Sequence, residues 1–131
     1  MNLVVDCSVF MSNILPNEEK SKIEYHLYDL YVPSIFFLEC SNVLLTALKK
    51  NRILENDYRE YISSLKDMPI RVDDFSSSSQ SLYFLGRLAK ENDLTAYDAS
   101  YLELALRIGA KMATCDEALK KACKKNKIIL I

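Results

Sequence analysis

The chain has 131 residues, of which 50% are apolar and 27% are charged, and its formal net charge at pH 7 is −1. This size and composition predict a single globular domain over residues 1–131. The balanced charge gives no support to a strong, non-specific nucleic-acid binder, so any binding of nucleic acid must be local. The apolar runs are too short to span a membrane and no signal-peptide pattern is present, so we expect a cytoplasmic protein with no membrane contact.

The first half of the chain predicts strands and helices in alternation. Short, continuous apolar runs are typical of strands buried on both faces, whereas apolar positions three and four residues apart are typical of helices. The elements expected here are a strand at 3–5, a helix at about 18–30, a strand at 30–32, a helix that is capped by Pro33 and Ser34 and runs to about Lys50, and a helix at 56–65.

The second half continues the same alternation. Its clearest element is a helix at 94–107, for which Thr95 supplies a capping side chain and Gly109 a C-terminal stop. Alternating strands and helices predict an α/β fold with a mostly parallel sheet of four or five strands flanked by helices. The other elements expected are a strand at 70–72, a helix from Ser76 or Ser77 to about Lys90, a strand at 111–115, a helix at 117–125 and a strand at 128–131.

The use of cysteine and histidine argues against two kinds of site. The cysteines lack the close, paired spacing of a zinc site, so we expect buried, reduced thiols rather than disulfides or a zinc centre. His26 is the only histidine, which argues against histidine-based nucleophilic catalysis. The cysteines are Cys7, Cys40, Cys115 and Cys123.

Two clusters of basic residues leave two interpretations open. Each can bind nucleic acid locally, or it can be the solvated face or C-terminus of a helix. The clusters consist of Lys49, Lys50 and Arg52, and of Lys120, Lys121, Lys124, Lys125 and Lys127.

Four acidic residues lie in largely apolar surroundings. Asp6 and Asp116 each follow a predicted strand, and Glu39 and Asp98 lie in early turns of predicted helices. Because ligands of parallel sheets bind at the carboxyl ends of the strands, all four acids can face one crevice there. Taken singly, an acid near a helix N-terminus is also a favourable surface residue, so the prediction depends on the four together.

Clustered carboxylates predict a cation. Two of them about 5 Å apart repel by roughly 3 kcal/mol at an effective dielectric near 20, so four together favour proton uptake or a bound ion. Oxygen ligands suit Mg²⁺ or Mn²⁺, and such ions activate water for attack on a phosphodiester. A glycosidase also uses two carboxylates, but it normally stacks sugars on exposed aromatic rings, and the chain has no tryptophan. The sequence therefore favours a metal-dependent phosphodiesterase.

Asn42 is expected to orient one of these acids. It lies three residues after Glu39, hence on the same helix face, where its amide can hydrogen-bond the carboxylate. The alternative is an exposed Glu and Asn pair on the solvent side of the helix.

Four short segments carry a family resemblance through their order and separation. They read Val-Val-Asp-Cys-Ser at 4–8, Val-Pro-Ser at 32–34 followed by Glu39 and Asn42, Leu-Thr-Ala-Tyr-Asp-Ala at 94–99, and Ala-Thr-Cys-Asp at 113–116. Together they resemble a PIN domain, and most closely the VapC-like toxins of bacterial and archaeal toxin-antitoxin pairs. The resemblance implies a PIN-like three-layer sandwich and an endoribonuclease that depends on Mg²⁺ or Mn²⁺. It also implies a homodimer and a cognate antitoxin that holds the RNA-cleaving site inactive.

The resemblance also assigns roles to individual residues. Asp6, Glu39, Asp98 and Asp116 would be the catalytic, metal-binding acids. Ser8 and Thr114 would be hydroxyl partners of metal-bound water or phosphate, with Asn42 and Thr95 in support. Two alternatives stay open, namely a PIN-type RNA-processing nuclease without an antitoxin and a non-catalytic PIN-fold binding or scaffold protein.

Three neighbours of the acids carry smaller expectations. Cys7 and Cys115 adjoin Asp6 and Asp116, and being small they are expected to pack inward beside the site. Glu117 is interpreted as an ordinary first-turn helix acid.

Overall fold

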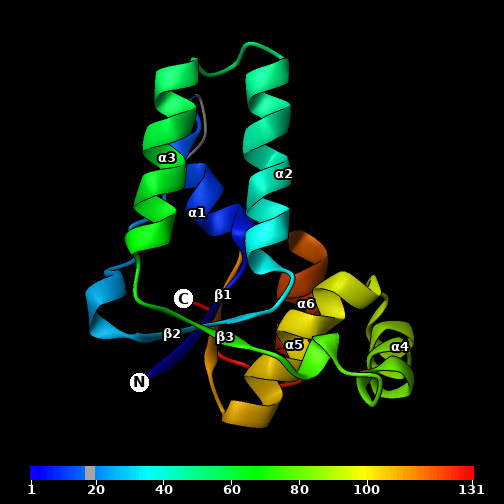
Figure 1. Ribbon diagram of the computed structural model, residues 1–131. Coiled ribbons are helices and arrows are strands. Elements are labelled where there is room, and N and C mark those ends of the chain that lie inside the picture. Colours follow the sequence, from blue (N-terminus) through cyan, green and yellow to red (C-terminus); the bar gives the residue numbers. More distant parts are fainter. Residues whose placement is uncertain (17–19) are drawn as a thin grey trace.

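The fold is built on one parallel sheet. The computed structural model describes residues 1–16 and 20–131 and is drawn as a ribbon in Figure 1. The strand order is β3-β2-β1-β4, and all three pairings are parallel, as the alternation of strands and helices predicts. The strands are β1 (Asn2–Val5), β2 (Asp29–Pro33), β3 (Ile70–Asp73) and β4 (Lys111–Ala113).

Helices flank this sheet in two groups. The antiparallel helices α2 and α3 stand side by side with α1 near their base, whereas α4, α5 and α6 gather at the other side, with α4 outermost (Figure 1). The predicted α/β class is therefore confirmed, with four strands. The helices are α1 (Cys7–Ile14), α2 (Phe36–Lys49), α3 (Glu55–Asp67), α4 (Ser81–Asn92), α5 (Ala96–Ile108) and α6 (Glu117–Lys125).

The core is centred on β1 and α5. Leu3, Val4 and Val5 of β1 are fully buried, as expected for an interior strand with helices on its faces. Helix α5 packs against β1, β2, α4 and α6, and its Tyr101 and Leu102 have no exposed surface. Burying one such leucine contributes about 2 kcal/mol, so this packing fixes α5 relative to the strand ends.

Both ends of α5 follow the sequence prediction. The Thr95 hydroxyl accepts a hydrogen bond from the Asp98 backbone N–H at 3.1 Å and caps the first turn. Gly109 ends the helix at φ 62°, in the left-handed region that glycine adopts without a steric penalty. This cap fixes Asp98 in the first turn, at the end of the helix that faces the carboxyl ends of the strands.

The predicted helix at 18–30 is wrong for the described residues 20–30. They contain a single 3-10 turn at Tyr25–Leu27 and the first two residues of β2, while residues 18 and 19 lie outside the described part. Tyr25 stacks on Phe10 with 4.9 Å between ring centroids, so its ring covers the core without helical spacing. His26 is exposed in this turn, with Nε2 4.0 Å from the Glu24 carboxylate, as an ordinary side chain.

Helix α1 is the element that the sequence prediction missed. It begins directly after β1, and it buries Val9, Phe10 and Met11 within eight residues. A helix this short lacks the repeats that reveal helical spacing, so its apolar residues continue the run of the strand without a visible break.

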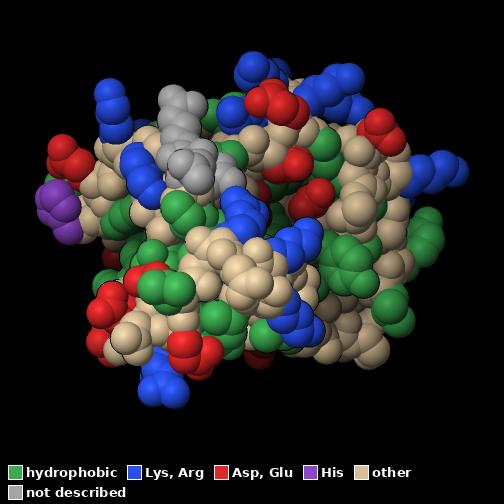
Figure 2. All heavy atoms as spheres, turned by 90° about the horizontal axis from the view of Figure 1, so that it is seen from above, with side chains coloured by type: hydrophobic (Ala, Val, Ile, Leu, Met, Phe, Trp, Pro, Cys, Tyr) green, Lys and Arg blue, Asp and Glu red, His purple; other side chains and the backbone are tan. Residues whose placement is uncertain are grey.

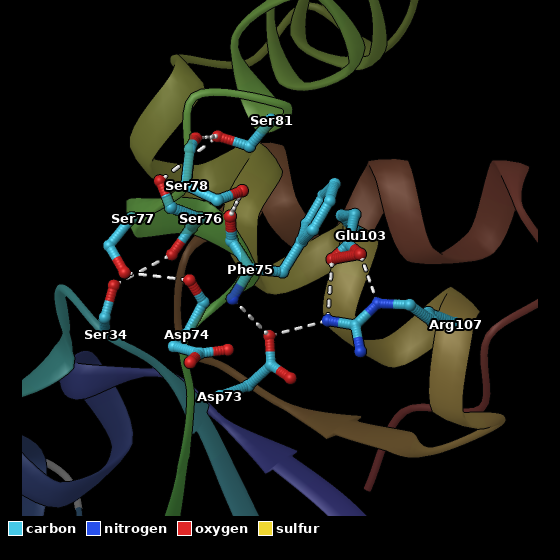
Figure 3. A network of polar contacts seen from close by, with 10 residues as sticks. All are labelled: Ser34, Asp73, Asp74, Phe75, Ser76, Ser77, Ser78, Ser81, Glu103 and Arg107. Carbon is cyan, nitrogen blue, oxygen red and sulfur yellow. Dashed lines mark hydrogen bonds and ion pairs between the residues drawn. The ribbon is translucent and has the colours of Figure 1, made fainter.

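Two predicted helix starts are also wrong. Ser34 does not cap α2, which begins at Phe36, and its Oγ lies 3.0 Å from Ser76 Oγ. Ser76 and Ser77 do not cap α4 either, because they belong to a 3-10 turn at Phe75–Ser77 and the helix begins at Ser81 (Figure 3). Serine hydroxyls in this segment donate to backbone carbonyls, which favours turns over a helix start.

The C-terminal strand is reduced to one bridge. Leu130 forms an isolated parallel bridge with Met112 of β4, and the residues expected at 128–131 form no longer strand. Among the described helices, none is both long enough and apolar enough to cross a membrane.

Candidate active site

The four singled-out acids line one cavity of about 710 Å³, which we call the acid cavity. Asp6 directly follows β1, Asp116 follows β4, and Glu39 and Asp98 lie in the first turns of α2 and α5. Figure 2 shows acidic side chains gathered at a hollow on this face, with basic side chains around it. Segments that are far apart in the sequence therefore place their carboxylates in a single space at the carboxyl ends of the parallel strands, as predicted.

Asp6 is held by two hydroxyl groups. Ser8 Oγ donates to Asp6 Oδ2 at 2.8 Å, and Thr114 Oγ1 donates to the same oxygen at 2.7 Å. The hydroxyls in turn accept from backbone N–H groups, Ser8 from Cys115 at 3.0 Å and Thr114 from Asp116 at 3.0 Å. This network joins the ends of β1 and β4, and both hydroxyls bind the same oxygen of Asp6, Oδ2.

Glu39 is oriented by a residue that sequence analysis missed. The Tyr101 hydroxyl donates to Glu39 Oε1 at 2.6 Å, and the ring of Tyr101 is fully buried in α5. Asn42, the predicted partner, is exposed and makes no hydrogen bond to Glu39, so that expectation is wrong. The sequence signal for Tyr101 is its place one turn after Asp98 on the same helix, although only the folded structure, in which its hydroxyl reaches Glu39 of α2, reveals its partner.

Asp116 and Asp98 occupy helix N-termini. Asp116 caps α6 by accepting from the Leu119 N–H at 2.8 Å through Oδ2, and Asp98 is held through its own backbone N–H on Thr95. Both carboxylates therefore lie where the helix dipole favours negative charge. Thr95 accepts from the backbone N–H of Asp98. Thr114 accepts from the backbone N–H of Asp116 and donates to the carboxylate of Asp6.

The acids perturb one another. Burial raises the pKa of the Glu39 carboxyl above its usual range, and the Asp6 and Asp98 charges add to this rise, while the hydrogen bond from Tyr101 offsets part of it. Burial and the Asp116 and Asp6 charges likewise raise the pKa of Asp98, against a smaller lowering by Thr95. Among the described residues, none of the ion pairs involves these four acids. Negative charge therefore accumulates in the acid cavity.

The donor set fits a hard divalent cation. Carboxylate and hydroxyl oxygens are the ligands that Mg²⁺ and Mn²⁺ prefer, and Mg²⁺ commonly keeps several of its waters while one or two carboxylates hold it. Within residues 1–16 and 20–131, no group of three or more His, Cys, Asp or Glu side chains forms a ready-made metal cluster. The residues thus supply suitable oxygens around a roomy cavity rather than a closed cage.

Basic and thiol groups complete the lining. Arg52 and Lys120, one from each basic cluster, line the acid cavity, and Lys120 Nζ lies 3.4 Å from the carboxylate of Glu117 at the rim. All four cysteines are free, as expected. Cys7 is buried against Cys40, with 3.4 Å between the sulfurs, but Cys115 is exposed, so the expectation that it packs inward is wrong.

The fold and the acid cavity together define a class of protein. Residues 3–125 match the model of the PIN domain, and the chain belongs to this family. It is similar to Ribonuclease VapC3 of Pyrobaculum aerophilum, with 25% identity over 124 residues that cover 91% of this chain and 92% of the relative.

Three solved structures share the fold. PAE2754 from Pyrobaculum aerophilum aligns with a TM-score of 0.66 and 22% identity, covering 99% of this chain and 83% of that one. FitAcB from Neisseria gonorrhoeae aligns with a TM-score of 0.64 and 14% identity over 98% and 96% of the two chains. VapBC2 from Rickettsia felis, solved with a DNA fragment from their promoter, aligns with a TM-score of 0.68 and 15% identity over 100% and 98%.

Proposed function

We propose that this chain, as one PIN domain over residues 1–131, is a metal-dependent endoribonuclease and the toxin of a toxin-antitoxin pair. The observation that carries the proposal is the acid cavity, where Asp6, Glu39, Asp98 and Asp116 converge without an ion pair among the described residues. The similarity to a curated ribonuclease over nearly the whole chain supports the same activity. The substrate is RNA, and the site of action is the cytoplasm.

The mechanism depends on how the chain holds its carboxylates. A Mg²⁺ or Mn²⁺ ion held by the four acids would activate water and stabilise the leaving oxygen of the phosphodiester. Ser8 and Thr114 fix Asp6 in one rotamer, and Tyr101 does the same for Glu39, so the acids present their remaining oxygens to the cavity without reorganising. Arg52 and Lys120 belong to the same lining and would bring positive charge near the phosphates of a bound strand.

The partner proposals follow from the relatives. We propose a cognate antitoxin that inserts a basic side chain into the acid cavity, because arginine pairs with clustered carboxylates through charge-assisted hydrogen bonds. Homodimer formation belongs to the same proposal. A PIN-type RNA-processing nuclease would share the site but lack the antitoxin, and a binding or scaffold protein would share the fold but not cleave.

Cleavage of labelled structured RNAs tests the proposal. Wild-type protein, Asp98→Asn and the control Asp67→Asn are each assayed with Mg²⁺, with Mn²⁺ and with EDTA. Asp67 is an exposed acid at the end of α3, so its variant makes the same chemical change outside the cavity. We expect metal-dependent cleavage that Asp98→Asn loses and Asp67→Asn keeps. Cleavage that persists in EDTA or in Asp98→Asn contradicts the proposal.

A further inference from the structure

A second cavity, of about 720 Å³, adjoins the acid cavity. The two share Ser12, Cys115 and Lys120 in their linings, so these residues form a common wall between them. The second cavity lies over α1 and the irregular segment before β2, and we call it the lysine cavity. A strand bound in the acid cavity therefore has a second concave surface directly beside it.

The two cavities have opposite charge. Among the described lining residues, the lysine cavity has Lys20, Lys22 and Lys120 against one acid, Glu24, whereas the acid cavity has five acids and two basic residues. Lys20 Nζ donates to the Asn13 and Leu15 carbonyls at 3.1 and 3.0 Å, which places its charge at the C-terminal end of α1. Three lysines of the described lining therefore bring positive charge to one space.

Apolar side chains also line the lysine cavity. Val9 is buried, Ile23 and Tyr28 are half-buried, and Leu27 is 59% exposed although it is a large apolar side chain. An aromatic ring and aliphatic side chains beside lysines match the two parts of a nucleotide, because bases stack on flat apolar surface and phosphates bind cations.

We propose that the lysine cavity binds the nucleotide next to the scissile phosphate of an RNA strand. Its phosphate contacts Lys22 and Lys120, and its base lies against Tyr28 and Leu27. This inference rests on the proposed function, and it adds a subsite that positions the strand across the common wall. RNA is favoured over an acidic peptide because a polynucleotide supplies both a phosphate for the lysines and a planar base for the apolar wall.

Binding of a single-stranded RNA oligonucleotide, followed by fluorescence anisotropy as a function of salt, tests the subsite. The background is Asp98→Asn, so that no strand is cut, and the variants are Lys22→Ala, Lys22→Glu and the control Lys66→Ala. Lys22 and Lys66 are both exposed, and Lys66 lies on α3 outside both cavities. We expect Lys22→Ala to weaken binding about five-fold and to reduce the salt slope by about 0.7, the value for one phosphate contact on a single strand. Lys22→Glu should weaken binding more, and Lys66→Ala should leave it unchanged.

Other outcomes separate this inference from the proposed function. Tight RNA binding that neither Lys22 variant changes overturns the subsite and leaves the nuclease proposal standing. Absence of RNA binding, together with absence of cleavage by the wild-type protein, overturns both. An oligoglutamate peptide that binds in a Lys22-dependent way while RNA does not would assign the lysine cavity to a protein partner and overturn the subsite.

Discussion

Two groups of acidic side chains from distant segments, both within the described residues, differ in their neighbours. In the acid cavity, the carboxylates contact hydroxyls, a phenol and backbone N–H groups. At the end of β3, Asp73 shares the guanidinium of Arg107 with the buried Glu103, in a group that we call the Arg107 clip (Figure 3).

The partners of the carboxylates therefore distinguish the two groups. In the Arg107 clip the carboxylates pair with a cation of the chain, whereas those of the acid cavity form no ion pair among the described residues. In the Arg107 clip, Nη2 of Arg107 lies 2.6 Å from Asp73 Oδ2, which also accepts from the Phe75 N–H, and the guanidinium lies 5.3 Å from the centre of the Phe75 ring. The two carboxylates raise the pKa of Arg107, so the cation is kept at any physiological pH. In the clip, a cation of the chain itself thus pairs with both carboxylates, whereas no ion pair among the described residues involves the four acids of the acid cavity, where the proposed metal ion would supply positive charge.

The largest effect is expected in the acid cavity. Asp6→Asn keeps the shape of the side chain and one acceptor for Ser8 and Thr114, but it removes the charge that a metal needs. RNA cleavage should fall more than about a hundred-fold while the protein stays folded. Single-turnover rates and a thermal melt measure the two parts, and full cleavage by this variant would remove Asp6 from the proposed site.

A substitution in the Arg107 clip should instead lower the free energy of unfolding. Arg107→Ala leaves Glu103, which is 5% exposed at its side chain, without its cation, and we expect a loss of about 2–3 kcal/mol in the free energy of unfolding. The matched control is Arg87→Ala, which breaks an exposed pair with Glu91 and should cost about 0.5 kcal/mol or less. Urea unfolding measures both variants, and equal losses would show that the clip is no more than a surface ion pair.

A smaller effect tests the positioning of Glu39. Tyr101→Phe keeps the buried ring but removes the hydrogen bond to Glu39, so cleavage should fall about ten-fold with a stability loss of about 1 kcal/mol. Asn42→Ala is the matched control and should change neither quantity. The opposite ranking of the two variants would restore the original expectation for Asn42.

The smallest effect is a pH dependence of stability. Because the pKa of Asp98 is raised on folding, the folded protein holds that proton more tightly than the unfolded chain does, and stability falls as pH rises from about 4 through the raised value. Without metal, Asp98→Asn should therefore melt a few degrees above wild type at pH 7, with the gap closing below pH 4. Asp67→Asn should show no such gap, and a lower melting temperature for Asp98→Asn at pH 7 would contradict the accumulation of charge.

Local sequence patterns predicted the elements that are long or apolar on both faces. The β1 run and the capped helix α5 were both expected, because burial and capping leave a direct mark on residue spacing. Helix α1 and the turn at Tyr25–Leu27 were not, since each is too short to show a period and depends on packing between Phe10 and Tyr25.

In the candidate site, the sequence predicted the acids but not the side chains that hydrogen-bond to them. The acids could be chosen because they follow strands or open helices, and the structure lines one cavity with them, although their catalytic roles stay predictions. Their partners could not be chosen in the same way. Tyr101 reaches Glu39 across 62 positions of sequence, and the hydroxyl of Thr114 reaches Asp6 across 108, so these contacts exist only after the sheet and α5 have assembled.

The most direct test of whether the acid cavity binds a divalent metal is a calorimetric titration of the metal-free protein with Mn²⁺, which measures binding without any RNA. We expect saturable binding by wild type and by Asp67→Asn, and its loss in Asp98→Asn. Arg107→Ala, where it remains folded, should bind like wild type because no residue of the Arg107 clip lines the acid cavity. Absence of binding by wild type, or equal binding by Asp98→Asn, would contradict the assignment of the acid cavity to a divalent metal.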